Sequence, residues 1–217
     1  MSKIRNIFLL LLAMFVLSGC VGGSTPEEKI YNVLEETVKK EEQFEEVQKP
    51  LKELEEKEQK LFKEIMSLGM KEIDKIVKLS DEALANVKER KQNIEKEQEA
   101  MDGAEEEFNK AEDYVKKLED KKLKKEAQTL IEKMSSRYKT HEKLTSAYLE
   151  ALALDKELYE MLKKEDLKME SLDKKISAIN KKYKEVISVN EKYNSQTEEF
   201  NKLKKQFYKN AKIEIEE

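Results

Sequence analysis

The sequence predicts an all-α protein, an elongated antiparallel helical bundle or coiled coil of about four long helices. The 217 residues are 41% charged and include only five Gly, two Pro and no Trp, a composition typical of long helices. Apolar residues recur at seven-residue spacing through most of the chain. This regular apolar stripe argues against a disordered chain of similar charge.

The first predicted helix begins at Thr25, which acts as a cap before Pro26 and two acids in the first turn. Its heptad register passes unshifted through Pro50, which predicts a kinked or briefly broken helix rather than a domain boundary. Gly69 is expected just past the end of this helix. The two heptad rows are Ile30, Thr37, Phe44, Leu51, Glu58 and Ile65, and Val33, Lys40, Val47, Leu54, Leu61 and Leu68.

A second helix contains heptad rows that run from Ile73 to Leu118. One row is apolar at nearly every position, whereas the companion row is weak in the middle, where it contains Arg90 and Glu97. Gly103 is expected to loosen this helix locally, at about 1 kcal/mol relative to Ala.

The third helix is predicted from about Leu123 to Leu162, and its wide apolar face suits contact with several neighbours. Asp166 is expected to cap the fourth helix, and Asn190 is expected to set the register within its seam. Six successive heptad positions of the fourth helix are apolar: Leu172, Ile179, Val186, Tyr193, Phe200 and Phe207.

Short connectors make successive helices antiparallel neighbours. Residues 27–66 have a net charge of −5 and residues 166–217 a net charge of +2, which is compatible with the first and fourth helices lying side by side. A closed four-helix bundle is therefore expected, and an open arrangement with a protruding hairpin is the alternative.

Residues 1–19 predict a lipoprotein signal peptide that is removed. Two basic residues precede an apolar run of eleven residues, which is shorter than the about 20 residues of a membrane-spanning helix. Leu17, Ser18, Gly19 and Cys20 resemble the lipobox of bacterial lipoproteins, whose Cys thiol receives a diacylglycerol before a peptidase cuts in front of it. An ordinary secretory peptide with an incidental Cys is the alternative.

We therefore expect residues 20–25 to form a lipidated tether and residues 26–217 to form a single elongated helical bundle domain. The acyl chains at Cys20 would hold the protein at the extracytoplasmic face of the cell membrane, since each buried CH₂ contributes about 0.8 kcal/mol.

Several classes of function are disfavoured. The net charge of −4 gives no concentrated basic footprint for nucleic acid. The lone His141 is expected to be buried and hydrogen-bonded, and the sequence contains no Gly-rich phosphate loop and no metal-ligand spacing. We expect no enzyme activity and no cofactor besides the covalent lipid. The acidic clusters are interpreted as solvated faces: Glu35-Glu36, Glu41-Glu42, Glu45-Glu46 and Glu105-Glu106-Glu107.

Two surfaces are candidates for binding. If Cys20 lies at the membrane, the turn between the second and third helices returns toward it, with six lysines that we expect to contact anionic lipid or wall polymer. These lysines are Lys116, Lys117, Lys121, Lys122, Lys124 and Lys125, opposite Lys204, Lys205, Lys209 and Lys212. A solvated helix end is the alternative.

The opposite turns contain methionines and leucines, which make adaptable binding surfaces but also close the end of a core. This candidate partner-binding tip consists of Met66, Leu68, Met70, Met161, Leu167 and Met169.

The lipobox, the opening TPEEKIYNVLEETVKKE at residues 25–41 and the charged four-helix pattern together resemble the cell-wall-binding lipoproteins of Gram-positive bacteria, the YkyA-like family. The resemblance implies an envelope location and wall association, with no transferable set of binding residues. We expect a membrane-anchored, non-catalytic lipoprotein that associates with the cell wall or envelope polymers. The alternative is an adaptor or chaperone-like module for an envelope enzyme or a secreted protein.

Overall fold

The computed structural model describes residues 24–213, with the side chains of residues 43–47 and of Met70 excepted. The predicted signal peptide, the lipobox with Cys20 and most of the tether lie outside the described residues, as do the side chains of Phe44 and Val47.

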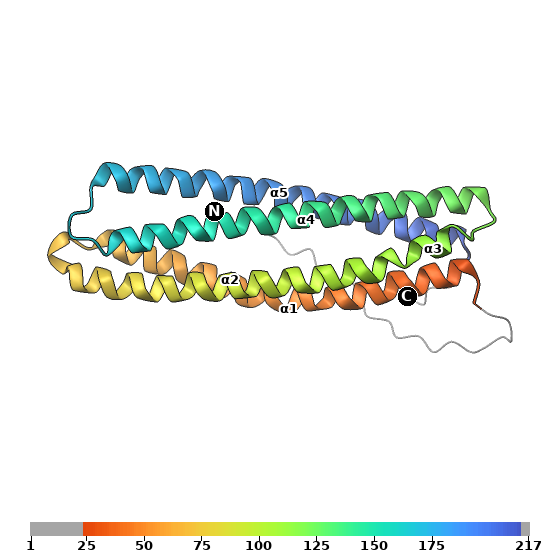
Figure 1. Ribbon diagram of the computed structural model, residues 1–217, viewed down its shortest axis with the longest axis horizontal. Helices are drawn as coiled ribbons and strands as arrows, with labels where there is room; N and C mark the ends of the chain where they lie inside the picture. Colours follow the sequence, from red (N-terminus) through yellow and green to blue (C-terminus); the bar gives the residue numbers. More distant parts are fainter. Residues whose placement is uncertain (1–23, 214–217) are drawn as a thin grey trace.

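Four long helices make up most of the described chain (Figure 1): α1 (Pro26–Ser67), α2 (Ile73–Asn109), α4 (Lys121–Leu162) and α5 (Met169–Asn210). Two short elements join them, the 3-10 turn η1 (Met70–Glu72) and the helix α3 (Ala111–Val115). No strand occurs among residues 24–213, so the all-α prediction is confirmed. A helix of 42 residues is about 63 Å long at 1.5 Å per residue.

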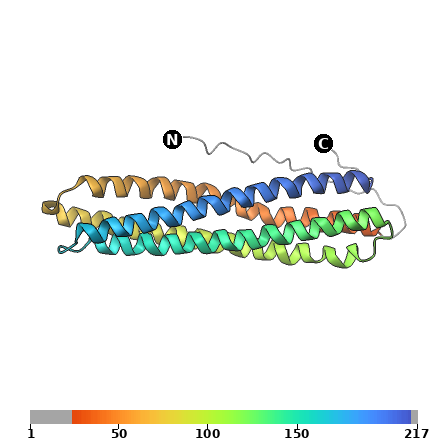
Figure 2. The same ribbon diagram turned by 90° about the horizontal axis from the view of Figure 1, so that it is seen from above.

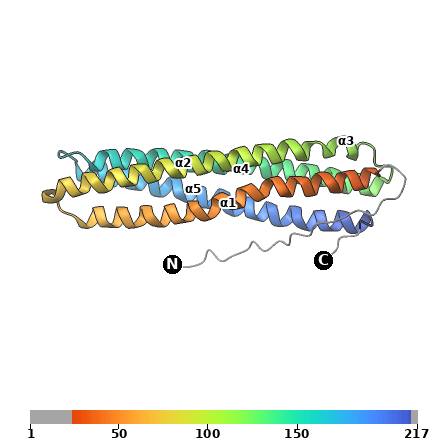
Figure 3. The ribbon, with the colours of Figure 1, turned by 90° about the horizontal axis from the view of Figure 1, so that it is seen from below.

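The helices form two antiparallel hairpins. Helix α1 packs along α2, α4 packs along α5, and α2 packs on α4 to join the two hairpins. Helices α1 and α5 cross in projection near the middle of the rod (Figures 2 and 3). They also meet through side chains, because Tyr208 Oη donates to Glu35 Oε1 at 2.8 Å. The four helices therefore form a bundle, without the protruding hairpin of the open alternative.

The two ends of the rod contain different turns (Figure 1). We call the end of the rod that contains the start of α1 the proximal end, because it lies nearest in sequence to Cys20. It also contains the connection from Val115 to Lys121 and the end of α5. At the distal end lie η1 and the connection from Lys163 to Lys168.

The N-terminal cap of α1 is a complete capping box. The Thr25 hydroxyl accepts from the Glu28 amide at 3.2 Å, and the Glu28 carboxylate accepts from the Thr25 amide at 2.9 Å. Pro50 lies inside α1, which continues through it to Ser67. Gly69 follows the helix as predicted, but its backbone is extended, with φ at −95°.

The apolar heptad positions are buried or partly buried where their side chains are described, whereas Lys40 of α1 is exposed. All six apolar positions of α5 are buried. The companion row that looked weak in the second predicted helix is also buried, Arg90 and Glu97 included. Its members are Ile76, Ala83, Arg90, Glu97 and Ala104 of α2, Ala111 of α3 and Leu118 just after it.

Three predictions about the helices are wrong. The second helix does not run to Leu118, since α2 ends at Asn109, the Lys110 amide bonds back to Glu107, and α3 follows as a separate turn. Asp166 does not cap α5, because it lies in the preceding turn and Lys168 occupies the cap position. Asn190 is exposed rather than in the seam, because α5 packs on α4 mainly through its other row.

We predict that Pro50→Ala stabilises the protein by about 1–3 kcal/mol, because an exposed Pro within a continuous helix removes one backbone hydrogen bond. Chemical denaturation followed by circular dichroism would measure the change. Lys49→Ala is the matched control at the neighbouring exposed position and should change stability by less than about 0.5 kcal/mol. A less stable Pro50→Ala protein would contradict the prediction.

Candidate functional site

Charged and hydroxyl side chains occupy much of the bundle interior, alongside two apolar clusters whose own tyrosines supply some of the hydroxyls. Among the described side chains, one cluster fills the distal half, up to Ile94 of α2 and Val186 of α5, and the other fills the proximal half, from Met101 and Tyr193 onward. We call the polar set the polar layer, and it consists of Glu41, Glu55, Glu58, Arg90, Glu97, Arg137, Tyr138, His141, Tyr148, Asp155, Tyr159, Tyr183 and Tyr193.

Arg137 of α4 connects three helices. Its guanidinium donates to both carboxylate oxygens of Glu41 on α1, at 2.7 and 2.9 Å, which is the bidentate geometry of a strong ion pair. It also donates to Tyr193 Oη at 2.5 Å and to Thr197 Oγ1 at 2.8 Å, both on α5. Burial opposes the charge of Arg137, but Glu41 and Tyr193 outweigh it and raise the pKa of the guanidinium. The prediction that Glu41 lies on a solvated face is therefore wrong.

Arg90 of α2 is the centre of a second set of hydrogen bonds. Its guanidinium donates to Tyr148 Oη at 2.8 Å, to Tyr183 Oη at 2.7 Å and, at 3.4 Å, to the Asp155 carboxylate. Burial would lower the pKa of Arg90, but the two tyrosines and Asp155 raise it above its ordinary value. Arg90, which is 1% exposed, is thus held charged between α4 and α5.

Tyrosine hydroxyls donate to carboxylates across the bundle. The Tyr148 hydroxyl accepts from Arg90 and donates to Glu55 on α1 at 2.6 Å, so a continuous path joins α2, α4 and α1. Burial raises the pKa of each such hydroxyl, and the neighbouring carboxylate raises it further. The five pairs are Tyr138–Glu41, Tyr148–Glu55, Tyr159–Glu58, Tyr183–Asp155 and Tyr208–Glu35.

His141 is buried and hydrogen-bonded, as predicted. Its Nε2 lies 3.0 Å from Glu97 Oε1, and the other Glu97 oxygen accepts from Gln48 Nε2 at 2.8 Å. These contacts link α4 to α2 and α2 to α1 at the level between Arg90 and Arg137. The arrangement is that of a structural histidine enclosed by packing.

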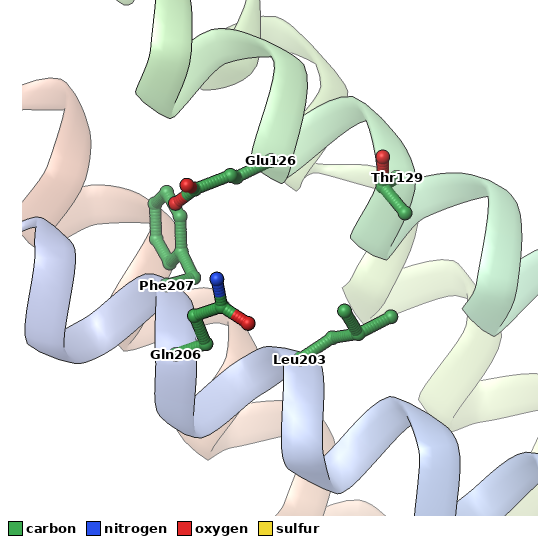
Figure 4. Close-up of a pocket in the computed structure, with 5 residues that line it drawn as sticks. All are labelled: Glu126, Thr129, Leu203, Gln206 and Phe207. Carbon is green, nitrogen blue, oxygen red and sulfur yellow. The ribbon is translucent and has the colours of Figure 1, made fainter.

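The polar layer offers little to a substrate, because its charged groups bind one another inside the bundle. A shallow pocket of about 70 Å³ lies elsewhere, between α4 and α5 near the proximal end (Figure 4). Its lining is Glu126, Thr129, Leu203, Gln206 and Phe207. The Glu126 carboxylate already accepts from Asn210 Nδ2 at 2.9 and 3.0 Å. Pockets for small molecules are several times larger, about 300–1,000 Å³.

The described residues contain neither a metal site nor a membrane-spanning helix. Within residues 24–213, no group of three or more His, Cys, Asp or Glu side chains is placed to hold a metal ion. None of the described helices combines the length and the apolarity needed to cross a membrane.

The predicted lysines lie together at the proximal end. The Asp120 carboxylate caps α4 by accepting from the amides of Lys122 and Leu123, at 2.7 and 2.9 Å, which offsets the unfavourable cations in its first turn. Lys124 Nζ donates to the Lys116 carbonyl at 2.7 Å and fixes the turn. Within this turn Lys116, Lys117, Lys121, Lys122 and Lys125 are exposed.

At the distal end, Met66 and Met169 are 44% and 63% exposed. Leu68 and Leu167 are partly buried against the distal apolar cluster, and Met161 is also partly buried. The Met70 side chain lies outside the described residues. Of the predicted partner-binding tip, Met66 and Met169 are exposed, whereas Leu68 and Leu167 close the end of the core.

The polar layer was missed as a site by sequence reasoning. The available signal was a charged residue on an otherwise apolar heptad row: Arg90 and Glu97 on α2, and Arg137 between Leu130 and Leu144 on α4. The acidic partners on α1 gave no such signal, since Glu41 and Glu55 resemble the many solvated acids around them.

Comparison with known proteins gives one family. A family model described as "Putative cell-wall binding lipoprotein", YkyA, matches residues 25–210. The chain is 34% identical over 193 residues to a Bacillus subtilis protein named "Uncharacterized lipoprotein YkyA", covering 89% of this chain and 86% of the relative. A Staphylococcus aureus crystal structure of a conserved protein of unknown function shares the fold, with a TM-score of 0.60 at 23% identity over 86% of this chain and 97% of that one.

We predict that Arg137→Ala lowers the free energy of unfolding by about 3 kcal/mol, because it leaves the half-enclosed Glu41 carboxylate without its bidentate partner. Lys139→Ala, an exposed position on the same helix, is the control and should be near neutral. A double-mutant cycle with Glu41→Gln would isolate the pair. Additive effects of the two substitutions would contradict the assignment.

The buried carboxyl of Asp155 predicts an unusual pH dependence. Burial raises its pKa to about 6, although the Tyr183 hydroxyl and Arg90 act to lower it. Because this pKa is higher in the folded chain than the ordinary 3.8, the folded state binds the proton more tightly, and the stabilisation is lost as the pH rises through about 6. From about pH 7 to about pH 5, the wild type should gain about 1 kcal/mol relative to Asp155→Asn. A difference that shrinks or stays constant on acidification would refute this.

Proposed function

Because the chain belongs to the YkyA family of cell-wall binding lipoproteins, we propose that it is a lipid-anchored, non-catalytic helical rod that associates with anionic polymers of the cell envelope. The rod lies on the extracytoplasmic face of the cell membrane, and its covalent lipid at Cys20 is its only cofactor.

The proposed anchor rests on the sequence around Cys20. The lipobox Leu17–Cys20 follows an apolar segment, and acylation of the Cys20 thiol would place several chains in the bilayer at about 0.8 kcal/mol per buried CH₂. Helix α1 begins at Pro26, six residues after Cys20, so the proximal end of the rod would lie close to the membrane.

The observation that supports polymer association is the placement of the lysine-rich turn. Lys116 to Lys125 lie at the same end of the rod as the start of α1, beside the end of α5 (Figure 1). An anionic surface or polymer near the membrane would meet this end first, and each lysine near such a surface contributes on the order of 1 kcal/mol, screened by salt. We propose a non-catalytic role because the charged groups of the polar layer bind one another inside the bundle.

Sedimentation with purified peptidoglycan tests this function. Acyl-free protein should co-sediment with peptidoglycan that retains its anionic polymers, and Lys121→Gln/Lys122→Gln/Lys125→Gln should reduce the bound fraction about tenfold at low salt. A control with three exposed lysines replaced on the first hairpin, Lys52→Gln/Lys60→Gln/Lys96→Gln, should bind as the wild type does. Equal sedimentation with polymer-free peptidoglycan would contradict the proposal.

The exposed distal methionines favour a second candidate function, as an adaptor for an envelope enzyme or a secreted protein. Met66 and Met169 belong to α1 and α5 and lie at the end farthest from the proposed anchor. Photo-crosslinkers at these two positions in intact cells should capture one defined protein if this function holds. Capture of nothing above the level seen at exposed Lys60 would exclude it.

A further inference from the structure

The two hairpins have opposite charge. Helices α1 and α2 together have 24 acids and 14 Lys or Arg residues, whereas α4 and α5 together have 13 acids and 19 Lys or Arg residues. The first hairpin therefore has a net charge of −10 and the second a net charge of +6. Although the net charge of the whole chain is only slightly negative, the two hairpins differ strongly in charge. Most of the net positive charge of the second hairpin belongs to α5.

One exposed row of α5 contains only lysine and serine. We call it the Lys/Ser row, and it consists of Lys174, Lys181, Ser188, Ser195, Lys202 and Lys209. All six residues are exposed. Comparable outward rows of the first hairpin mix the two signs of charge, as in Lys75, Glu82, Glu89 and Lys96 on α2.

The Lys/Ser row points directly away from the bundle along the whole of α5. Successive residues of an α-helix are rotated by about 100°, so each member of the Lys/Ser row lies about 200° around the helix from the buried residue two positions before it, such as Lys174 after Leu172. The inward row from Leu172 to Phe207 is buried at all six heptads, so the seven-residue register keeps its orientation to the core. The opposite row is therefore turned outward from Lys174 to Lys209, over about 52 Å.

The charge within this row is concentrated toward its two ends. Lys184 extends the distal group next to Lys181, and Lys205 extends the proximal group next to Lys202. Between the groups, Ser188 and Ser195 are flanked by Glu191 and Glu198, which are also exposed. Lys181 and Lys202 are 21 residues apart, a separation of about 32 Å along the helix.

We propose that the Lys/Ser row binds a linear, phosphate-bearing polyanion that lies along α5 and bridges its two lysine groups. Lysine is a point-charge ligand for phosphate, and the serine hydroxyls between the groups can donate to phosphate oxygens without adding negative charge. A linear partner fits because the positive charge follows the long axis of the rod rather than forming a compact patch. The proposal rests on the proposed association with envelope polymers, and it gives such a polymer a contact surface well beyond the proximal end.

A polyanion long enough to reach both lysine groups binds more tightly than one that reaches a single group. Binding of the second group becomes intramolecular, which raises the affinity by about 10²-fold or more when the chain spans the distance. Long-chain inorganic polyphosphate should therefore bind the acyl-free protein at least about tenfold more tightly per phosphate than tripolyphosphate. Isothermal titration calorimetry at low salt measures both.

Substitution of three row residues tests the assignment. Lys181→Gln/Lys202→Gln/Lys209→Gln should weaken the binding of long-chain polyphosphate by at least about tenfold and remove its advantage over tripolyphosphate. The matched control Lys52→Gln/Lys60→Gln/Lys96→Gln removes the same charge from the acidic hairpin and should stay within about twofold of the wild type. Equal loss in both variants, or no dependence on chain length, would overturn the proposal.

Two further outcomes separate the alternatives. If the proximal variant Lys121→Gln/Lys122→Gln/Lys125→Gln loses wall sedimentation while the row variant binds polyphosphate as the wild type does, the proposed function stands and this inference fails. Salt-sensitive self-association of the wild type without polyphosphate, abolished in the row variant, would assign the row to the acidic hairpin of a second copy and overturn the polymer proposal. Analytical ultracentrifugation reports that outcome directly.

Discussion

The structure depends on two buried guanidinium groups that need partners from other helices. A buried cation costs several kcal/mol unless its hydrogen bonds are all made. Arg137 can meet that requirement only with Glu41 from α1 and Tyr193 from α5 in place, and Arg90 only with Tyr148, Asp155 and Tyr183. A shift of one long helix by one heptad would break these contacts, whereas apolar rows that repeat every seven residues would tolerate it. The polar layer thus sets the register, and the two apolar clusters supply the burial around it.

That fixed register decides what the rod presents at its surface. With α4 and α5 held in place against α1, the lysine-rich turn lies beside the start of α1 and the outer row of α5 runs the length of the rod. The same packing leaves Met66 and Met169 exposed at the far end. The rod presents a long outer row on α5 with lysines grouped toward its two ends, and two ends of different composition.

Much of the fold could be predicted from the sequence, because the spacing of apolar residues along a long amphipathic helix indicates which face is buried. The six heptad positions of α5 and the cap at Thr25 are examples. The polar layer could not be predicted, since its cross-helix pairs join residues 28 to 101 positions apart. Glu41 pairs with Arg137 across 96 residues, and nothing local distinguishes it from Glu42. The prediction that Asp166 caps α5 was wrong because the turn is longer than expected: the Leu167 amide bonds to the Lys164 carbonyl, Leu167 packs against the distal apolar cluster, and α5 begins only at Met169.

The most direct test of this account is an alkaline titration of tyrosine ionisation, with helix content followed in parallel by circular dichroism. Six hydroxyls lie in or beside the cross-helix contacts, and burial raises the pKa of each: Tyr138, Tyr148, Tyr159, Tyr183, Tyr193 and Tyr208. We expect these six hydroxyls to ionise only as the helices unfold. Reversible ionisation of most tyrosines near the ordinary pKa of about 10, with the helices intact, would show that the hydroxyls are not enclosed and would contradict the polar layer as the constraint on the fold.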